Sequence, residues 1–240
     1  MQEKSLTHLS HHSISLIQNN PQQYLEIYLE QKKILPSPQT SYQFEIGTAF
    51  HLVMKQIQMG LPVTPLLKNY PKIKQWIKKL KLAAPYIFAP APQNTLKECE
   101  YPRNLMIKCC LLCCVYDMVI ASEQEARIIE WTTAKIPFNA QTLNWHWQTR
   151  FYLYVFVETM NYQPEEVSLT YYFVKTDSIA QQFTVYYTAT QHKQTQLDLL
   201  ELIDKRTQLI KNYQKDKVHS KNKLINSLLN IEDIPEVPII

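Results

Sequence analysis

The fold is decided by the stretch Tyr116-Asp-Met-Val-Ile-Ala-Ser-Glu-Gln-Glu-Ala-Arg-Ile-Ile-Glu-Trp-Thr-Thr133, in which two apolar segments flank a short polar one. Apolar segments separated by polar turn residues are typical of a β-hairpin. The polar residues Ser122–Glu125 predict a four-residue turn, so that Ala121 lies opposite Ala126. The stretch therefore predicts two antiparallel strands in a defined register.

This register places Asp117 directly opposite Glu130. Opposed residues share one face of a sheet, with their Cβ atoms ~5 Å apart. Two carboxylates at that distance between apolar strands repel each other unless a cation neutralises them. Oxygen ligands of this kind favour Mg²⁺ or Mn²⁺. The alternative is a register shifted by one residue, which would place the carboxylates on opposite faces and leave one exposed.

Around the hairpin, the chain alternates between helical and extended patterns. Helical spacing of apolar residues predicts three helices first, over Ser13–Gln31, Tyr42–Met59 and Pro65–Leu82. Pro21 is expected to interrupt the first helix and Pro71 the third. A β-β-α-β-β-α block then follows, over Leu105–Ile120, Ala126–Thr132, Gln141–Met160, Val167–Lys175, Gln182–Tyr187 and Gln191–Asn212. We expect an α/β fold, with a mixed β-sheet flanked by helices and a helical N-terminal lobe.

Composition excludes several classes of protein. The 240 residues are 45% hydrophobic and 19% charged, which is an ordinary globular composition. Only 2 glycines occur, so phosphate-binding glycine loops and dinucleotide-binding fingerprints are excluded. No apolar run approaches the ~20 residues that span a bilayer, and no signal-peptide core is visible, so we expect a cytoplasmic protein with no membrane partner. Four of the 5 cysteines lie in Cys109–Cys114, which favours packing of a central strand over disulfide bonds or a zinc site.

Two pairs of residues four apart accompany the hairpin. Gly47 and His51 lie on one face of the second predicted helix, and Gln148 and Tyr152 lie on one face of a later helix. A glycine inside a helix is unfavourable by ~1 kcal/mol relative to alanine, which indicates a close packing neighbour. Taken alone, His51 is more typical of a core or surface histidine than of a metal ligand. Gln148 and Tyr152 alone are typical of a partly buried helix face.

Taken in order, these motifs resemble the RecB-like branch of the PD-(D/E)XK nuclease superfamily. That branch combines a Gly-x-x-x-His helix, an Asp after an apolar strand, an acidic-x-Lys-Thr strand end and a Gln-x-x-x-Tyr helix. The matching residues here are Gly47 and His51, Asp117, Glu130 with Thr132 and Thr133, and Gln148 and Tyr152. The resemblance covers roughly residues 6–210 and implies a restriction-endonuclease-like fold and cleavage of DNA phosphodiester bonds.

The resemblance also implies a role for each matching residue. It implies Mg²⁺ or Mn²⁺ bound by His51, Asp117, Glu130 and the carbonyl of Trp131. Gln148, Tyr152 and Thr132 would position the DNA. Glu98 or Glu100 would add an upstream carboxylate, although neither fits the pattern cleanly. Some relatives hold an iron–sulfur cluster with flanking cysteines, which are missing here, so no cluster is expected.

Thr132 departs from the pattern, because a lysine is expected at that position. Losing such a group typically costs ~10²–10⁴-fold in rate. Lys135 follows shortly after, and its flexible stem makes it the candidate replacement, so that Asp117, Glu130 and Lys135 form the expected catalytic set. The alternative is a catalytically inactive DNA-binding or scaffold subunit that works with a helicase or a recombination or repair subunit.

The chain is expected to divide into a helical region over 1–92 that contributes Gly47 and His51, a nuclease core over 93–212 and a lysine-rich tail over 213–240. The segment Lys68–Lys81 interleaves six lysines with Tyr70 and Trp76. Such a surface suits contact with DNA phosphates, with an aromatic ring for a base. The alternative is a solvated helix face.

Overall fold

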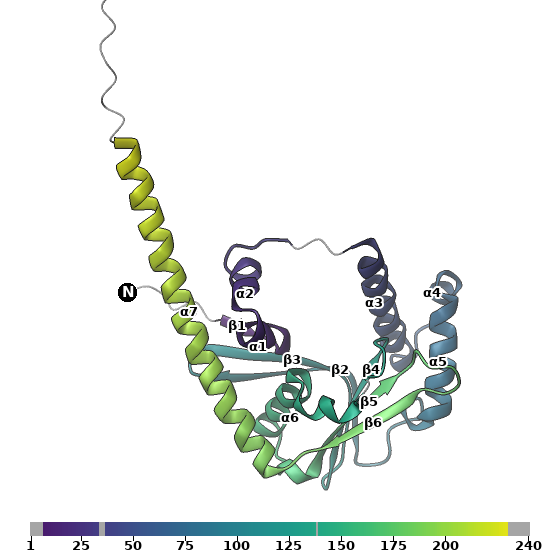
Figure 1. Cartoon of the computed structure of the whole chain (residues 1–240). Coiled ribbons are helices and arrows are strands. Elements are labelled where there is room, and N and C mark those ends of the chain that lie inside the picture. The colour runs from purple at the N-terminus through teal and green to yellow at the C-terminus, as the bar shows by residue number, and fades with distance from the viewer. Residues whose placement is uncertain (1–6, 34–36, 138, 230–240) are drawn as a thin grey trace, which may run out of the picture.

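A six-stranded mixed sheet forms the centre of the structure, a computed structural model that describes residues 7–33, 37–137 and 139–229, with side chains up to residue 219 (Figure 1). The strands are β1 (Thr7–Leu9), β2 (Leu96–Ile107), β3 (Cys110–Ala121), β4 (Ala126–Thr132), β5 (Val167–Phe173) and β6 (Gln181–Tyr186). The α-helices are α1 (His11–Asn19), α2 (Pro21–Tyr28), α3 (Pro38–Gln58), α4 (Thr64–Asn69), α5 (Pro71–Ala83), α6 (Trp147–Thr159) and α7 (Ala189–Leu229). Short 3₁₀ helices are η1 (Pro85–Ile87), η2 (Ala140–Trp145) and η3 (Pro164–Glu166). The expected α/β class with a mixed sheet flanked by helices is confirmed.

Helices cover both faces of the sheet and create two hydrophobic cores. Helices α1, α2, α6 and α7 pack on one face, and α3 and α5 pack on the other (Figure 1). Strand β4 shows the division, because Ile128 belongs to the first core while Ile129 and Trp131 belong to the second. Alternation of side chains along a strand produces this arrangement. The hairpin that carries Asp117 and Glu130, the predicted metal ligands, therefore lies between two helical layers.

Strand β3 is the central strand, and its pairing confirms the predicted register. Strand β2 runs antiparallel along the full length of one edge. The other edge is shared, with β1 parallel to the start of β3 and β4 antiparallel to its end. Ala121 pairs with Ala126 and Met118 pairs with Ile129, as the four-residue turn requires.

The sequence analysis missed strand β2, because it treated Leu105–Ile120 as a single strand. The chain instead reverses at Lys108-Cys109, so that Ile107 pairs with Cys110. Lys108 has a left-handed φ of 52°, and its Nζ lies 2.5 Å from Asp204 Oδ1 on α7. Two-residue hairpin turns need positive φ and usually contain Gly or Asn, neither of which marks this turn.

Several other boundaries differ from the prediction. The N-terminal region is not wholly helical, since β1 joins the sheet. The predicted interruptions at Pro21 and Pro71 are confirmed, because Pro21 begins α2 after α1 and Pro71 begins α5 after α4. Helix α6 begins later than expected, after η2, and α7 extends beyond Asn212 to Leu229. The end of the predicted tail 213–240, from residue 230, lies outside the described residues.

Within the described part of the chain, no helix has both the length and the apolar character needed to cross a membrane.

Candidate metal centre

The site lies in a fork between β3 and β4. The backbone pairing of the two strands stops at Met118 and Ile129, one residue before Asp117 and Glu130 would pair. Side chains replace the ladder at this point. The Asp117 N–H donates to Glu130 Oε1 at 3.1 Å, and the Trp131 N–H donates to Asp117 Oδ2 at 2.9 Å. These two N–H groups are thereby satisfied by a carboxylate of the opposite strand, so the strands can separate here without leaving either N–H unpaired.

The side chains of β3 change faces at Asp117. Before it, alternate residues such as Cys114 and Tyr116 point into the first core. After it, Met118 points into the second core and Val119 into the first. A regular strand would keep one parity throughout. Asp117 therefore sits where the strand turns over, and its carboxylate can meet groups from both faces of the sheet.

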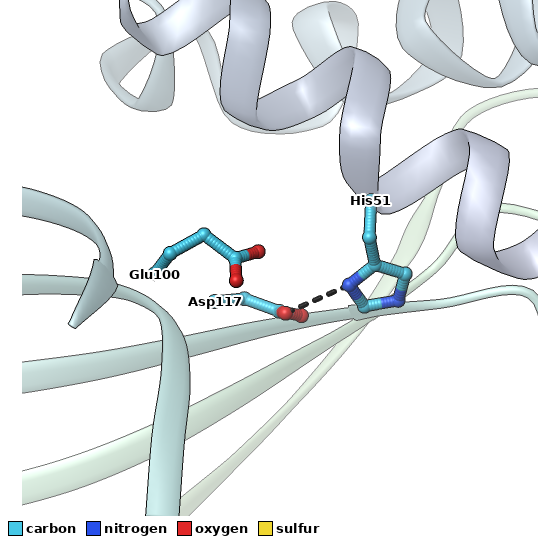
Figure 2. Close-up of side chains that lie close together, drawn as sticks. All are labelled: His51, Glu100 and Asp117. Carbon is cyan, nitrogen blue, oxygen red and sulfur yellow. Dashed lines mark hydrogen bonds and ion pairs between the residues drawn. The ribbon is translucent and has the colours of Figure 1, made fainter. Parts of the chain in front are cut away.

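His51 reaches this carboxylate from α3. Its Nδ1 lies 2.8 Å from Asp117 Oδ1, as Figure 2 shows. Helix α3 is oriented by the buried residues Ile46, Phe50 and Val53, which leaves His51 on the side that faces the fork. Burial of the imidazole lowers its pKa, but the hydrogen bond to Asp117 and the charges of Asp117 and Glu100 outweigh it. The pKa of His51 therefore lies above its ordinary value.

Glu100 completes a cluster with these two residues. A ring nitrogen of His51, a carboxylate oxygen of Glu100 and a carboxylate oxygen of Asp117 all lie within 4.8 Å of one another (Figure 2). Glu100 lies on β2, and the register of β2 with β3 places it opposite Asp117. Its φ of 54° is unusual for a residue inside a strand. The left-handed backbone at Glu100 interrupts the pairing of β2 with β3 next to Asp117. The interruption therefore lies at a residue of the metal-ligating type.

A divalent cation fits this donor set. Two carboxylates and an imidazole are ligands of common divalent metals, with ligand distances of roughly 2.0–2.6 Å. Donor atoms within 4.8 Å of one another can all reach one ion at such distances. A bound cation would also offset the repulsion between the carboxylates of Glu100 and Asp117.

Glu130 lies beside the cluster and is held by hydrogen bonds. Its Oε1 accepts from the Asp117 N–H, and its Oε2 accepts from Gln148 Nε2 at 3.0 Å. Burial raises the pKa of Glu130 well above its ordinary value, and the charge of Asp117 raises it further. Among the side chains that the structure describes, Glu130 lies beside the cluster of His51, Glu100 and Asp117 and outside its 4.8 Å limit. Its role as a metal ligand stays a prediction.

A cavity of about 310 Å³ borders the site at His51 and Glu130. Its lining includes His51, Glu130, Thr132, Lys135 and Gln148. Thr132 is half-buried, and its Oγ1 accepts from the Ala134 N–H at 3.0 Å. Lys135 is exposed at the rim of the same cavity. Lys135, the predicted substitute for the missing lysine, thus shares a cavity with three of the predicted metal ligands, His51, Glu130 and Trp131.

Gln148 and Tyr152 differ in their accessibility. Gln148 lines the cavity and holds Glu130, as described above. Tyr152 is buried, its ring lies edge-on to His11 and Tyr116, and its carbonyl accepts from the Tyr116 hydroxyl at 3.0 Å. Its contacts are those of a packing residue that fixes α6 against β3.

A second cavity of about 440 Å³ adjoins the first and shares His146 and Gln148 with it. The exposed Trp145 and one side of α1, from His11 to Asn19, line the rest of it. Burial, with His12 beside it, lowers the pKa of His11 to about 4, so this imidazole is neutral at neutral pH. Sequence reasoning missed His146 and Trp145, because no spacing pattern links them to the carboxylates.

Gly47 lies where α3 passes the end of β4. A Cβ at this position would lie 3.5 Å from Thr133 Oγ1, which is an ordinary contact. We therefore expect Gly47→Ala to raise the free energy of unfolding by about 0.5–1 kcal/mol through helix propensity. Gly47→Leu, whose side chain must displace Thr133, should lower it by about 1–3 kcal/mol. Urea denaturation of the two variants measures both effects, and a destabilising alanine would contradict the packing described here.

The place of Glu100 in the cluster predicts that its substitution weakens metal binding. Glu100→Gln should weaken Mn²⁺ binding about tenfold or more, because it removes one charged ligand. The matched control is Glu98→Gln, since Glu98 is exposed on the same strand. Isothermal titration with Mn²⁺ measures both. Equal affinity in the two variants would show that Glu100 is not a ligand.

The fold and site together define an α/β protein whose sheet opens around a candidate divalent-metal centre. The family model of the PD-(D/E)XK nuclease superfamily matches residues 8–222, and the chain belongs to that superfamily. The chain is also similar to a crystal structure named "Putative exonuclease" from Eubacterium rectale, with a TM-score of 0.52 and 8% identity over 87% of this chain and 84% of that one. At this identity the likeness shows the fold alone. No curated protein matches the chain.

Proposed function

We propose that the protein is a metal-dependent DNA nuclease of the RecB-like type. The observation that carries the proposal is the meeting of His51, Glu100 and Asp117 within 4.8 Å, in a chain of the PD-(D/E)XK superfamily. Enzymes of this superfamily typically use divalent metals, and the oxygen-rich donor set favours Mg²⁺ or Mn²⁺. The metal, when bound, supplies an activated water and charge stabilisation for the phosphate.

The chain's own residues have separable roles in this proposal. His51, Glu100 and Asp117 hold the metal. Glu130 accepts from the Asp117 N–H and so fixes the position of that ligand. Gln148 fixes Glu130 in turn, through its Nε2. The two hydrogen bonds keep the fork in one geometry, which is the preorganisation that catalysis requires.

Lys135 supplies positive charge at the rim of the cavity. In this proposal its ammonium group takes the place of the lysine that Thr132 replaces, and it contacts the phosphate that is cleaved. Its exposed four-carbon stem allows the approach. The RecB-like assignment is supported by the order of Gly47, His51, Asp117, Glu130 and Gln148 along the chain.

Incubation of the purified protein with single-stranded and duplex DNA, with Mg²⁺, with Mn²⁺ and with EDTA, tests the proposal. We expect cleavage that requires the metal. Thr132 favours a second function, a nuclease-fold subunit that binds DNA without cutting it and works with a helicase or a repair subunit. Salt-sensitive DNA binding without cleavage under any metal condition would favour that second function.

A further inference from the structure

Two lysines from separate elements meet on helix α3. Lys72 lies at the start of α5, and its Nζ lies 5.7 Å from the ring centroid of Tyr42 on α3. Lys175 follows β5, and its Nζ lies 2.6 Å from Oε1 of Gln43, the next residue along α3. Lys175 also lies over the ring of Trp76, one turn after Lys72 on α5. Both ammonium groups are therefore gathered at the first part of α3.

Helix α3 connects these lysines to the metal centre. Gln43, Gly47 and His51 follow one another at intervals of four residues and lie along one side of the helix. Gln43 contacts Lys175, Gly47 faces Thr133, and His51 contacts Asp117. Eight residues of helix span about 12 Å, which a DNA strand covers in a few nucleotides. Lys135 lines the same cavity as His51, and its charge acts on Lys175, so it is near both ends of this path.

The lysines of this group, Lys72, Lys135 and Lys175, have no carboxylate in ion-pair contact in the described part of the chain. Burial lowers the pKa of Lys175, and the charges of Lys72 and Lys135 lower it further, which places both ammonium groups within electrostatic reach of Lys175. Lysines that repel one another without an acidic partner on the protein are suited to an external anion.

Trp76 has a different role from the one the sequence analysis considered. Its side chain is buried against Phe50, so it offers no ring to a DNA base. The lysines of α5 also divide between two sides of the helix. Lys72 lies on the side of α3, whereas Lys74 and Lys78 lie on the opposite side and are exposed. This division provides a matched control.

We propose that Lys72 and Lys175, with Lys135 between them and the metal centre, form a clamp for backbone phosphates of DNA a few nucleotides from the bond that is cleaved. The inference rests on the proposed function, because it takes DNA as the substrate of the metal site. The clamp binds phosphates of any sequence, and it directs one end of the strand along α3 towards His51.

Fluorescence anisotropy with labelled DNA in EDTA tests the clamp without cleavage. Binding is measured from about 50 to about 300 mM NaCl for the wild type, the Lys72→Gln/Lys175→Gln variant and the Lys74→Gln/Lys78→Gln control, which loses the same charge. The clamp variant should lower the slope of log affinity against log salt by about 2, or about 1 for each lysine. The control variant should leave the slope near the wild-type value. Circular dichroism checks that both variants fold.

A single uncharged methylphosphonate linkage, moved along the DNA, adds a positional readout. It should weaken wild-type binding most at the position of the clamp, and have no such effect on the clamp variant. Equal slopes for clamp and control variants, or no salt-dependent binding by the wild type, would overturn the proposal. If the wild type never cleaves DNA but the clamp variant still lowers the slope of log affinity against log salt, the clamp is upheld and the nuclease function is rejected.

Discussion

Replacing Asp117 by asparagine is expected to lower the rate of metal-dependent DNA cleavage by about 10³-fold or more. Asp117 contacts His51 through one oxygen and the Trp131 N–H through the other, and it belongs to the metal cluster. Asparagine keeps an oxygen for the Trp131 N–H, so the fork between the strands should persist. The variant loses the negative charge that attracts the cation.

Single-turnover cleavage of labelled DNA over a range of Mn²⁺ concentrations measures this effect. Asp216→Asn is the control, since Asp216 is exposed on α7. Thermal unfolding without metal should show that Asp117→Asn is folded. Full activity of Asp117→Asn would reject the metal mechanism.

Replacing Lys135 by glutamine is expected to lower the cleavage rate by about 10²-fold, the usual cost of losing one electrostatic contact to the transition state. Introducing Thr132→Lys into the same variant should restore much of that loss. Thr132 lines the cavity and lies two residues after Glu130, so a lysine there would point to the same side of β4 as Glu130.

Single-turnover rates at saturating Mn²⁺ are compared for the wild type, the two single variants Lys135→Gln and Thr132→Lys, and the double variant. Lys74→Gln is the charge-matched control for Lys135→Gln. If the Lys135→Gln variant is as active as the wild type, Lys135 does not replace the missing lysine. If Thr132→Lys changes the rate in neither background, position 132 does not contribute to the chemistry in this chain.

The hairpin around the fork could be predicted because its signal is local. A four-residue polar turn between apolar strands determines the register, and β3 and β4 keep that register as far as Met118 and Ile129. The separate partners of the Asp117 and Glu130 side chains could not be predicted. Opposed residues normally share one kind of environment. Here the strands separate, so Asp117 joins His51 while Glu130 turns to Gln148 on the other face.

Glu100 shows why long-range structure was needed to find the cluster. Its position opposite Asp117 follows from the hairpin turn at Lys108-Cys109. That turn has no glycine or asparagine, and its stabilising contact comes from Asp204, far along the chain on α7. Once the turn is placed, counting along the two strands pairs Glu100 with Asp117. The left-handed backbone of Glu100 then marks it as a residue held for a purpose other than sheet pairing.

The metal centre itself is tested most directly by diffraction from crystals soaked in Mn²⁺, with data collected at a wavelength where manganese scatters anomalously. We expect one anomalous peak bounded by the side chains of His51, Glu100 and Asp117, and its loss in crystals of Asp117→Asn. A peak bound elsewhere, or wild-type crystals with no peak at a saturating Mn²⁺ concentration, would contradict a divalent-metal centre in the fork between β3 and β4.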